Sequence, residues 1–99
     1  MARHILTNKA VEDLSRIWEY TYEVWLESQA DKYYELLISS FQEIVQNPAL
    51  GKNYTEIDGA ILGLRVGKHI VFYRLIKSND IEIVRILHQR MDLKSRMDE

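Results

Sequence analysis

The sequence predicts a single α+β domain, and two patterns along the chain lead to that fold class. Apolar residues recur at three- and four-residue steps through the first half, whereas β-branched and aromatic residues dominate after Gly59. The first spacing is typical of amphipathic helices, and the second composition is typical of strands. A chain of 99 residues has room for one hydrophobic core, so we expect one domain over residues 1–99.

The first predicted elements are a short strand and a helix. His4-Ile5-Leu6 is a short apolar run, and the Thr7 that follows it is a favourable helix N-cap residue. From residue 11 to residue 26 apolar side chains recur every three or four positions. This stripe predicts an amphipathic helix that packs one face on the core.

A second apolar stripe runs from residue 30 to residue 45 and predicts a second helix. Ser28 and Asp31 have the spacing of a capping box at its start. The helix should end before Asn47-Pro48, because proline disfavours the helical conformation in the residue before it. The connection between the stripes is very short, so the two helices should form an antiparallel hairpin.

The second half predicts a three-stranded antiparallel meander, which gives the order β-α-α-β-β-β. Gly67-Lys68 and Ser78-Asn79 are plausible two-residue hairpin turns between the strands. After Gln89 the sequence becomes polar and predicts a short tail or helix. The helices should cover one face of the sheet. The predicted strands are residues 59–67, 69–77 and 81–88.

Two-residue turns determine the register of the meander, and register determines which side chains share a face. In this register Phe72 lies opposite Arg85, and His69 lies opposite His88. The face toward the helices carries Leu62, Leu64, Val66, His69, Val71, Tyr73, Leu75, Val84, Ile86 and His88. The other face carries Arg65, Ile70, Phe72, Arg74, Ile83, Arg85 and Leu87. Because unpaired guanidinium groups are costly to bury, we expect this second face to be open, partly apolar and cationic.

Charge and composition exclude several classes of protein. The net charge is −2, with −4 in residues 1–50 and +2 in residues 51–99, so contact with nucleic acid would need a local basic patch or a partner protein. The absence of cysteine excludes disulfides and thiolate metal sites. No signal peptide and no membrane-spanning apolar run is present, so we expect a cytoplasmic protein with no membrane contact.

The order of motifs resembles the ParE branch of the RelE/ParE toxin superfamily over nearly the whole chain. Single motifs are weak, but the last one, together with the order of the others, is specific. The motifs are Leu6-Thr7, Glu12-Asp13-Leu14, Ile17-Trp18-Glu19-Tyr20, Asn47-Pro48, Leu50-Gly51, Arg65, His69-Ile70-Val71-Phe72-Tyr73-Arg74 and Ile83-Val84-Arg85-Ile86-Leu87-His88-Gln89-Arg90-Met91-Asp92.

The resemblance implies a toxin that is kept inactive by a ParD-like antitoxin. Such an antitoxin dimerises and binds operator DNA through its N-terminal part, so this chain would meet operator DNA only indirectly. ParE members typically act on DNA gyrase as protein inhibitors, whereas RelE members cleave mRNA in the ribosome. A toxin fold without activity is a third possibility.

The end of the chain favours gyrase inhibition over RNA cleavage. A ribonuclease needs a general base, a general acid and cations around the phosphate, and RelE-like toxins supply a Tyr or His near the C-terminus. Arg65 and Arg85 match the cationic positions, but no Tyr or His follows His88. We therefore expect a non-enzymatic inhibitor without catalytic residues, and keep mRNA cleavage as the alternative.

The same resemblance and the apolar stripes give two sets of candidate contact residues. The first set should contact the target: Arg65, Arg85, His88, Arg90, Met91 and Asp92. The second should contact the antitoxin: Trp18, Tyr22, Trp25, Ile70, Phe72 and Arg74.

No cofactor or metal is expected. His69 and His88 are best interpreted as a hydrogen-bonded pair across two strands, because two imidazoles alone make a poor zinc site. The acidic pair Glu12-Asp13 is best interpreted as part of a solvated helix face.

Overall fold

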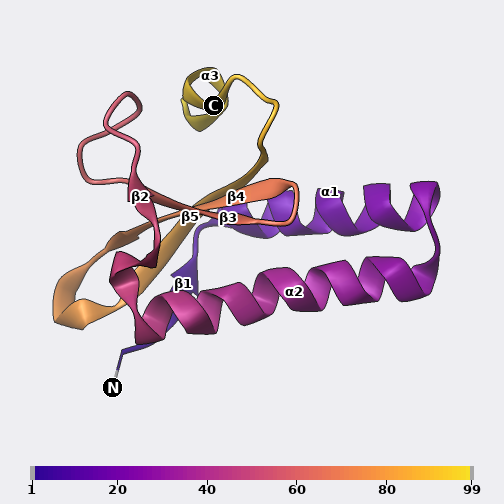
Figure 1. Cartoon of the computed structure of the whole chain (residues 1–99), viewed down its shortest axis with the longest axis horizontal. Helices are drawn as coiled ribbons and strands as arrows, with labels where there is room; N and C mark the ends of the chain where they lie inside the picture. Colours follow the sequence, from indigo (N-terminus) through magenta and orange to yellow (C-terminus); the bar gives the residue numbers. More distant parts are fainter. Residues whose placement is uncertain (1, 99) are drawn as a thin grey trace.

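The computed structural model describes residues 2–98 and, for Ser78, the main chain alone. Helices α1 and α2 lie antiparallel against one face of the sheet, and their connecting turn extends well beyond it (Figure 1). Among the described residues the sheet order is β1-β5-β4-β3-β2, which confirms the predicted α+β class. The elements are β1 (His4–Leu6), α1 (Asn8–Val24), α2 (Glu27–Gln46), the 3-10 turn η1 (Pro48–Leu50), β2 (Lys52–Asn53), β3 (Leu62–Val66), β4 (His69–Leu75), the 3-10 turn η2 (Lys77–Asn79), β5 (Ile81–His88) and α3 (Leu93–Met97).

Strand β1 joins the sheet beside β5, and the two strands run parallel. The pairing ends where Leu6 lies opposite Ile83, so the outer edge of β5 has no neighbouring strand after that point. Helix α1 begins there, and the Thr7 hydroxyl accepts a hydrogen bond from Ala10 N at 3.1 Å, as its predicted capping role requires. The short first strand therefore brings the start of α1 to the open edge of β5.

The start of α2 differs from the prediction, whereas its end confirms it. Leu26 is the N-cap residue and has no side-chain hydrogen bond, so the capping box of Ser28 and Asp31 is wrong. The helix begins at Glu27, so Ser28 already lies within its first turn. At the other end α2 stops at Gln46, ahead of Pro48.

The first hairpin turn has the predicted register, with Val66 opposite His69 and Arg65 opposite Ile70. Gly67 has a φ of +59°, which favours glycine over every residue that carries a Cβ atom. A Cβ there would also lie 2.7 Å from the ring of Tyr33. Glycine is therefore required at this turn for its conformation and for the close approach of α2.

The second hairpin departs from the predicted register through a β-bulge in β5. Phe72 pairs with Arg85 as expected, but Tyr73 pairs with Ile83, so Val84 is the additional residue. The turn is also wider than predicted, because residues 77–79 form the 3-10 turn η2. As a result Ile83 packs in the cluster beneath the helices, and Val84 packs on the opposite side, which reverses their predicted faces.

The main core lies between the sheet and the helices. Its largest fully buried side chain is Tyr73, whose hydroxyl donates to Pro48 O at 2.7 Å and accepts from Gly51 N at 2.8 Å. These bonds attach η1 to the centre of the sheet, and burial raises the pKa of the Tyr73 hydroxyl. The buried residues of this core are Ala10, Leu14, Leu37, Phe41, Ile44, Val66, Val71, Tyr73, Ile81, Ile83 and Ile86.

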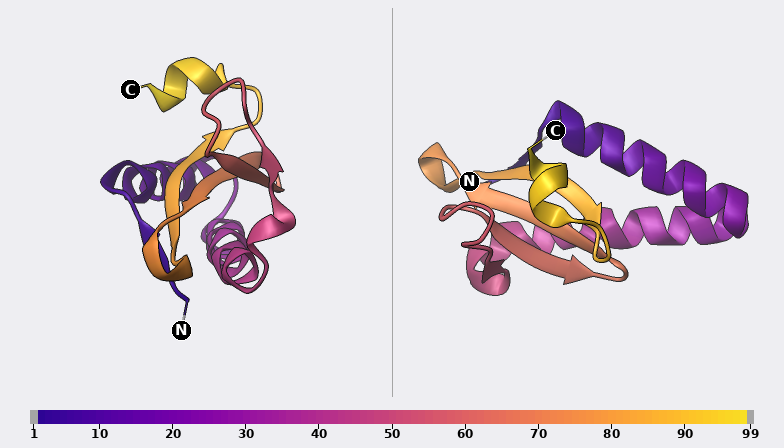
Figure 2. Two further views of the ribbon diagram at one scale, coloured as in Figure 1. Left: turned by 90° about the vertical axis from the view of Figure 1, so that its left-hand side faces the viewer. Right: turned by 90° about the horizontal axis from the view of Figure 1, so that it is seen from above.

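The opposite sheet face is covered as well, so the prediction of an open cationic face is wrong. Segment 54–61 and α3 both lie over this face (Figure 2). They form a second cluster in which Ile70 is 6% exposed and Phe72 is fully buried. Its buried members are Tyr54, Ile61, Ile70, Phe72 and Leu87, and Ile57, Val84, Leu93 and Met97 pack against them.

Candidate functional site

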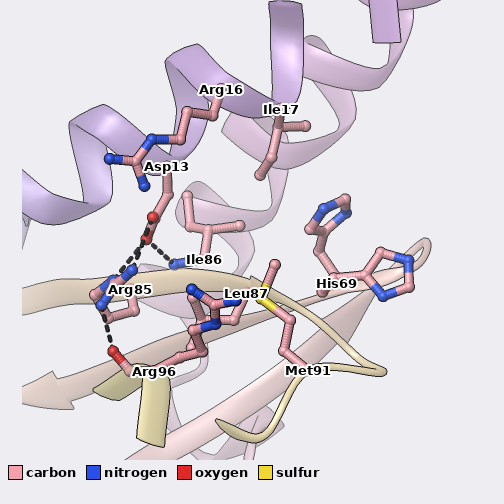
Figure 3. A pocket seen from close by; sticks show the side chains of 10 residues that line it. Asp13, Arg16, Ile17, His69, Arg85, Ile86, Leu87, Met91 and Arg96 are labelled. Atoms are coloured by element: carbon pink, nitrogen blue, oxygen red, sulfur yellow. Dashed lines mark hydrogen bonds and ion pairs between the residues drawn. The ribbon is translucent and has the colours of Figure 1, made fainter. Parts of the chain in front are cut away.

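Asp13 of α1 and Arg85 of β5 form a buried ion pair at the edge of the sheet. Arg85 Nε lies 2.8 Å from Asp13 Oδ2, and Arg85 Nη2 lies 3.0 Å from Asp13 Oδ1. Both residues are 5% exposed. Arg85 Nη1 also donates to the main-chain oxygen of Arg96 at 2.6 Å, so one guanidinium connects α1, β5 and α3 (Figure 3).

Two features of the fold bring Asp13 and Arg85 together. Arg85 directly follows the bulge at Val84, and β1 ends before it reaches this position. Asp13 then accepts a hydrogen bond at 3.0 Å from Ile86 N, a buried main-chain amide of β5 beyond the end of β1. The predictions that Arg85 lies on an open face and that Asp13 is solvated are therefore wrong.

A cluster of His69, His88 and Tyr33 lies at the far end of β5. The His69 and His88 ring centroids are 5.3 Å apart, as expected for a cross-strand pair. Burial, reinforced by the neighbouring His88, lowers the pKa of His69 to about 4, so this imidazole is neutral at pH 7. The Tyr33 hydroxyl, whose pKa is raised by burial, forms a hydrogen bond of 2.6 Å with His69 Nδ1 and accepts one from Lys68 N.

The ion pair and the histidines line one small cavity of about 80 Å³. Its walls come from α1, the end of β4, β5 and the segment that leads into α3 (Figure 3). Small-molecule sites usually enclose about 300–1,000 Å³, so this cavity is too small for a substrate or cofactor. It is lined by Asp13, Arg16, Ile17, His69, Arg85, Ile86, Leu87, His88, Met91 and Arg96.

The structure brings some of the predicted target-contacting residues together and separates others. Arg85, His88 and Met91 all line the small cavity, although Arg85 is buried. Arg90 is exposed beside them, and its amide donates to His88 Nδ1 at 3.1 Å. Two further members of the set have other positions: Asp92 is the N-cap residue of α3, and Arg65 is exposed on β3, two strands away from β5.

The predicted antitoxin-contacting residues also divide into two groups. Tyr22 and Trp25 are exposed near the tip of the helical hairpin, and Tyr22 stacks on Trp18 with a centroid distance of 5.2 Å. Ile70 and Phe72 are buried in the second cluster, beneath segment 54–61 and α3, so their contact with an antitoxin stays a prediction. Arg74, the last member of the set, is exposed and bound to Glu82 at 2.7 Å.

Sequence reasoning missed Asp13, Arg16 and Arg96 as parts of this site. A signal existed for Asp13, because it lies three residues after Ala10 and beside Leu14, on the buried stripe of α1. An acid on such a stripe requires a buried partner. Arg16 and Arg96 carried no comparable signal, since both are exposed and meet only through the tertiary structure.

No metal centre or membrane span is found in the part of the chain that the structure describes. Over residues 2–98 no three His, Cys, Asp or Glu side chains gather closely enough to hold a metal ion. None of the described helices has the length and apolarity needed to cross a bilayer. The polar centre of the site is thus built from the ion pair and the histidines.

The family of the chain follows from its similarity to known proteins. The family model described as "ParE toxin of type II toxin-antitoxin system, parDE" matches residues 5–93. The chain belongs to the ParE toxin family. It is 36% identical over 92 residues to toxin ParE1 of Mycobacterium tuberculosis, covering 93% of this chain and 94% of that toxin. With toxin ParE1 of Caulobacter vibrioides it shares 30% identity over 97 residues, covering 98% and 99% of the two chains.

The fold of this ParE-family toxin also matches a solved structure. A chain from the chromosomal ParDE toxin–antitoxin system of P. aeruginosa superimposes with a TM-score of 0.74 at 20% identity. The match covers 89% of this chain and 95% of that one. The family model and the related toxins confirm the resemblance inferred from the motif order, and the fold is that of a chain from a ParDE system.

Proposed function

We propose that this ParE-family toxin inhibits DNA gyrase as a binding protein without catalytic residues of its own. Family membership supports a toxin of a type II pair. The observation that supports the absence of catalytic residues is that the polar groups at the end of β5 are already hydrogen-bonded within the chain. Arg85 is bound to Asp13 and to the main chain of Arg96, and Nδ1 of both His69 and His88 is already hydrogen-bonded.

Cleavage of RNA by this site would need a different arrangement. The reaction needs an acid–base pair with access to the ribose and a guanidinium that reaches the phosphate. His69 has a pKa of about 4, and Nδ1 of its ring is bonded to the Tyr33 hydroxyl. One observation favours the ribonuclease alternative, since Arg16 and His88 line the same cavity.

The contact surface for gyrase is assigned to the tail that leaves β5. Arg90 and Met91 are exposed there, and His88 is half-buried beside them. Arg65 is exposed on β3 and remains a candidate contact. Arg85 and Asp92 contribute by holding this segment, Arg85 through α3 and Asp92 as its N-cap.

We assign the antitoxin contact to an apolar surface at the end of the helical hairpin. This hairpin-tip patch consists of Tyr22, Val24, Trp25 and Leu26, which are 49%, 52%, 62% and 68% exposed. Contiguous exposed apolar groups of this kind mark sites of protein association. Glu23 and Glu27 flank the patch, so an apolar antitoxin segment with basic residues would complement it.

The toxin would act in the cytoplasm and would reach operator DNA only through its antitoxin. The sharpest test adds the purified toxin to gyrase, ATP and plasmid DNA. Loss of supercoiling, or accumulation of cleaved plasmid, is expected, and the ParD-like antitoxin should restore normal supercoiling. Unchanged gyrase activity together with cut mRNA on translating ribosomes would instead establish the ribonuclease alternative.

A further inference from the structure

A second hollow of about 340 Å³ lies beside the cavity, between the first turns of α1 and helix α3. We call it the α1–α3 groove, and its size is within the usual range of ligand sites. Every residue that lines it is ionisable. The lining residues are Lys9, Glu12, Arg16, Arg85 and Arg96.

On the α1 side of the groove two cations, Lys9 and Arg16, face one carboxylate, Glu12. Asp13 balances Arg85, which forms the floor of the groove. Glu12 lies 3.8 Å from Arg16, but both side chains are more than half exposed, so their attraction is weak. No carboxylate lies within ion-pair distance of Lys9 in the described part of the chain. An anion can therefore replace Glu12 as the partner of Arg16 at little cost.

The geometry of α1 places two cations, with Glu12 between them, in a row along the groove. Lys9, Glu12 and Arg16 are separated by three and four residues, so they lie along one face of the helix. Lys9 and Arg16 are seven residues apart, which corresponds to about 10 Å along the axis. A DNA strand rises about 3.4 Å per nucleotide, so the row spans about three nucleotides.

The chemistry of the lining selects the backbone of a nucleic acid rather than a protein or a free base. Protein interfaces have cores depleted in charged residues, but this groove is lined by charged residues throughout. It contains no aromatic ring on which a base could stack. Guanidinium and ammonium groups do match phosphate oxygens, and such contacts position a protein on DNA without reading its sequence.

We propose that the α1–α3 groove binds the phosphodiester backbone of double-stranded DNA. This inference rests on the proposed function, because the groove shares Arg16, Arg85 and Arg96 with the cavity beside the tail assigned to gyrase. A toxin bound to gyrase through that tail would then hold the DNA segment next to it. The hairpin tip, where Glu23 and Glu27 lie, is at the other end of α1 from the first turns that line the groove (Figure 1).

The test measures fluorescence anisotropy of a labelled 20-base-pair duplex at several salt concentrations. The variant Lys9→Gln/Arg16→Gln removes two exposed cations of the groove, and Lys32→Gln/Lys77→Gln removes two exposed cations elsewhere. We expect the first variant to bind the duplex at least about tenfold more weakly than the control. The slope of its log binding constant against log salt concentration should be smaller in magnitude by about two. Equal losses in the two variants would overturn the proposal.

Two further arms separate the possible ligands. Inorganic phosphate, added at constant ionic strength to protein labelled with ¹⁵N, tests whether the groove binds free anions. Shifts of the Lys9 and Arg16 amides with phosphate but not with the duplex would overturn the assignment to DNA. Tighter binding of a single-stranded RNA of the same length would also overturn it.

The same variants distinguish this inference from the function on which it rests. Wild-type toxin that inhibits gyrase, with equal duplex binding in the two variants, would refute the groove and leave the function standing. Groove-dependent duplex binding without any effect on gyrase would refute the function and leave the groove standing. If both hold, the groove variant should need several-fold more toxin than the control to inhibit gyrase.

Discussion

At the scale of single residues, the ion pair of Asp13 and Arg85 has more partners than any other polar contact of the site. Asp13 accepts two hydrogen bonds from Arg85 and one from Ile86 N, all within 3.0 Å. A buried ion pair offsets its desolvation only when both partners are satisfied. The pair therefore contributes mainly by determining where α1, β5 and α3 meet.

Replacement of Asp13 should be strongly destabilising. Asp13→Ala leaves the guanidinium of Arg85 in a buried position without its carboxylate, at a cost of about 3–5 kcal/mol in the free energy of unfolding. The matched control is Glu12→Ala, because Glu12 is exposed and only weakly paired with Arg16. Urea unfolding should show a change below about 0.5 kcal/mol for the control. Similar effects of the two substitutions would contradict the role of the buried pair.

His69 should make the stability of the toxin depend on pH. Its pKa is about 4 when folded and about 6.5 when unfolded, so the unfolded chain binds more protons between these values. The corresponding stability is present above pH 6.5 and is lost as the pH falls toward 4. Because the imidazole is only partly buried, we expect a loss of about 1–2 kcal/mol between pH 7.5 and 5.0.

The variant His69→Gln tests this assignment, because glutamine can accept from Tyr33 but does not titrate. Urea unfolding at pH 7.5 and 5.0 should give a smaller difference in the variant than in the wild type. A pH dependence that is unchanged by the substitution would mean that groups other than His69 cause it.

At the scale of secondary structure, α3 covers the second cluster and also anchors the tail. Leu93 and Met97 pack against the cluster that contains Phe72 and Leu87. Arg85 Nη1 binds the main chain of Arg96, so the helix is held to the sheet by apolar contact and by one charge-assisted hydrogen bond.

Loss of the apolar face of α3 should expose the second cluster without unfolding the domain. Leu93→Ser/Met97→Ser should lower the free energy of unfolding by about 2 kcal/mol and increase the binding of a hydrophobic dye such as ANS. Lys94→Ser/Asp98→Ser changes exposed residues of the same segment and serves as the control. Equal dye binding in both variants would mean that α3 does not seal this face.

At the scale of the whole molecule, the apolar and basic surfaces lie at different ends. The helical hairpin that carries the hairpin-tip patch projects beyond the sheet (Figure 2). The α1–α3 groove instead lies between the first turns of α1 and helix α3. Under the proposed function, an antitoxin segment would occupy one end of α1, at a distance from the tail that we assign to the target. An antitoxin bound at the hairpin tip would then have to extend to the tail in order to block the contact with the target.

Substitution of the hairpin-tip patch should weaken the toxin–antitoxin complex and leave folding unchanged. Trp25→Ser/Leu26→Ser removes two side chains that are 62% and 68% exposed, so stability should change little. Loss of two apolar anchors should reduce affinity for the antitoxin by at least about tenfold in titration calorimetry.

The matched control for the patch is Leu75→Ser, since Leu75 is 47% exposed on β4 at the far end of the molecule. It should leave the affinity for the antitoxin unchanged. If the control weakened the complex as much as the patch variant, the antitoxin contact would not be centred on the hairpin tip.

The elements of this toxin follow from local rules that act along the sequence. The Thr7 cap, the helix end ahead of Pro48 and the turn at Gly67 all depend on nearby residues, and all were predicted. The pairing of His69 with His88 was also predicted, but it has the predicted register because the bulge at Val84 offsets the wider turn between β4 and β5. The order of the motifs was also enough to identify the family, because the order is specific even though each single motif is weak.

The tertiary structure alone decided the site. One added residue at Val84 changes the face of its neighbours in β5, and no local preference announces a bulge there. Ile70 and Phe72 are buried because segment 54–61 and α3, which belong to other parts of the sequence, pack over them. The meeting of Asp13 with Arg85, 72 residues apart, likewise depends on where β1 ends. Sequence therefore determined the elements and the family, whereas the packing of distant segments determined which charges are buried and which remain available to a partner.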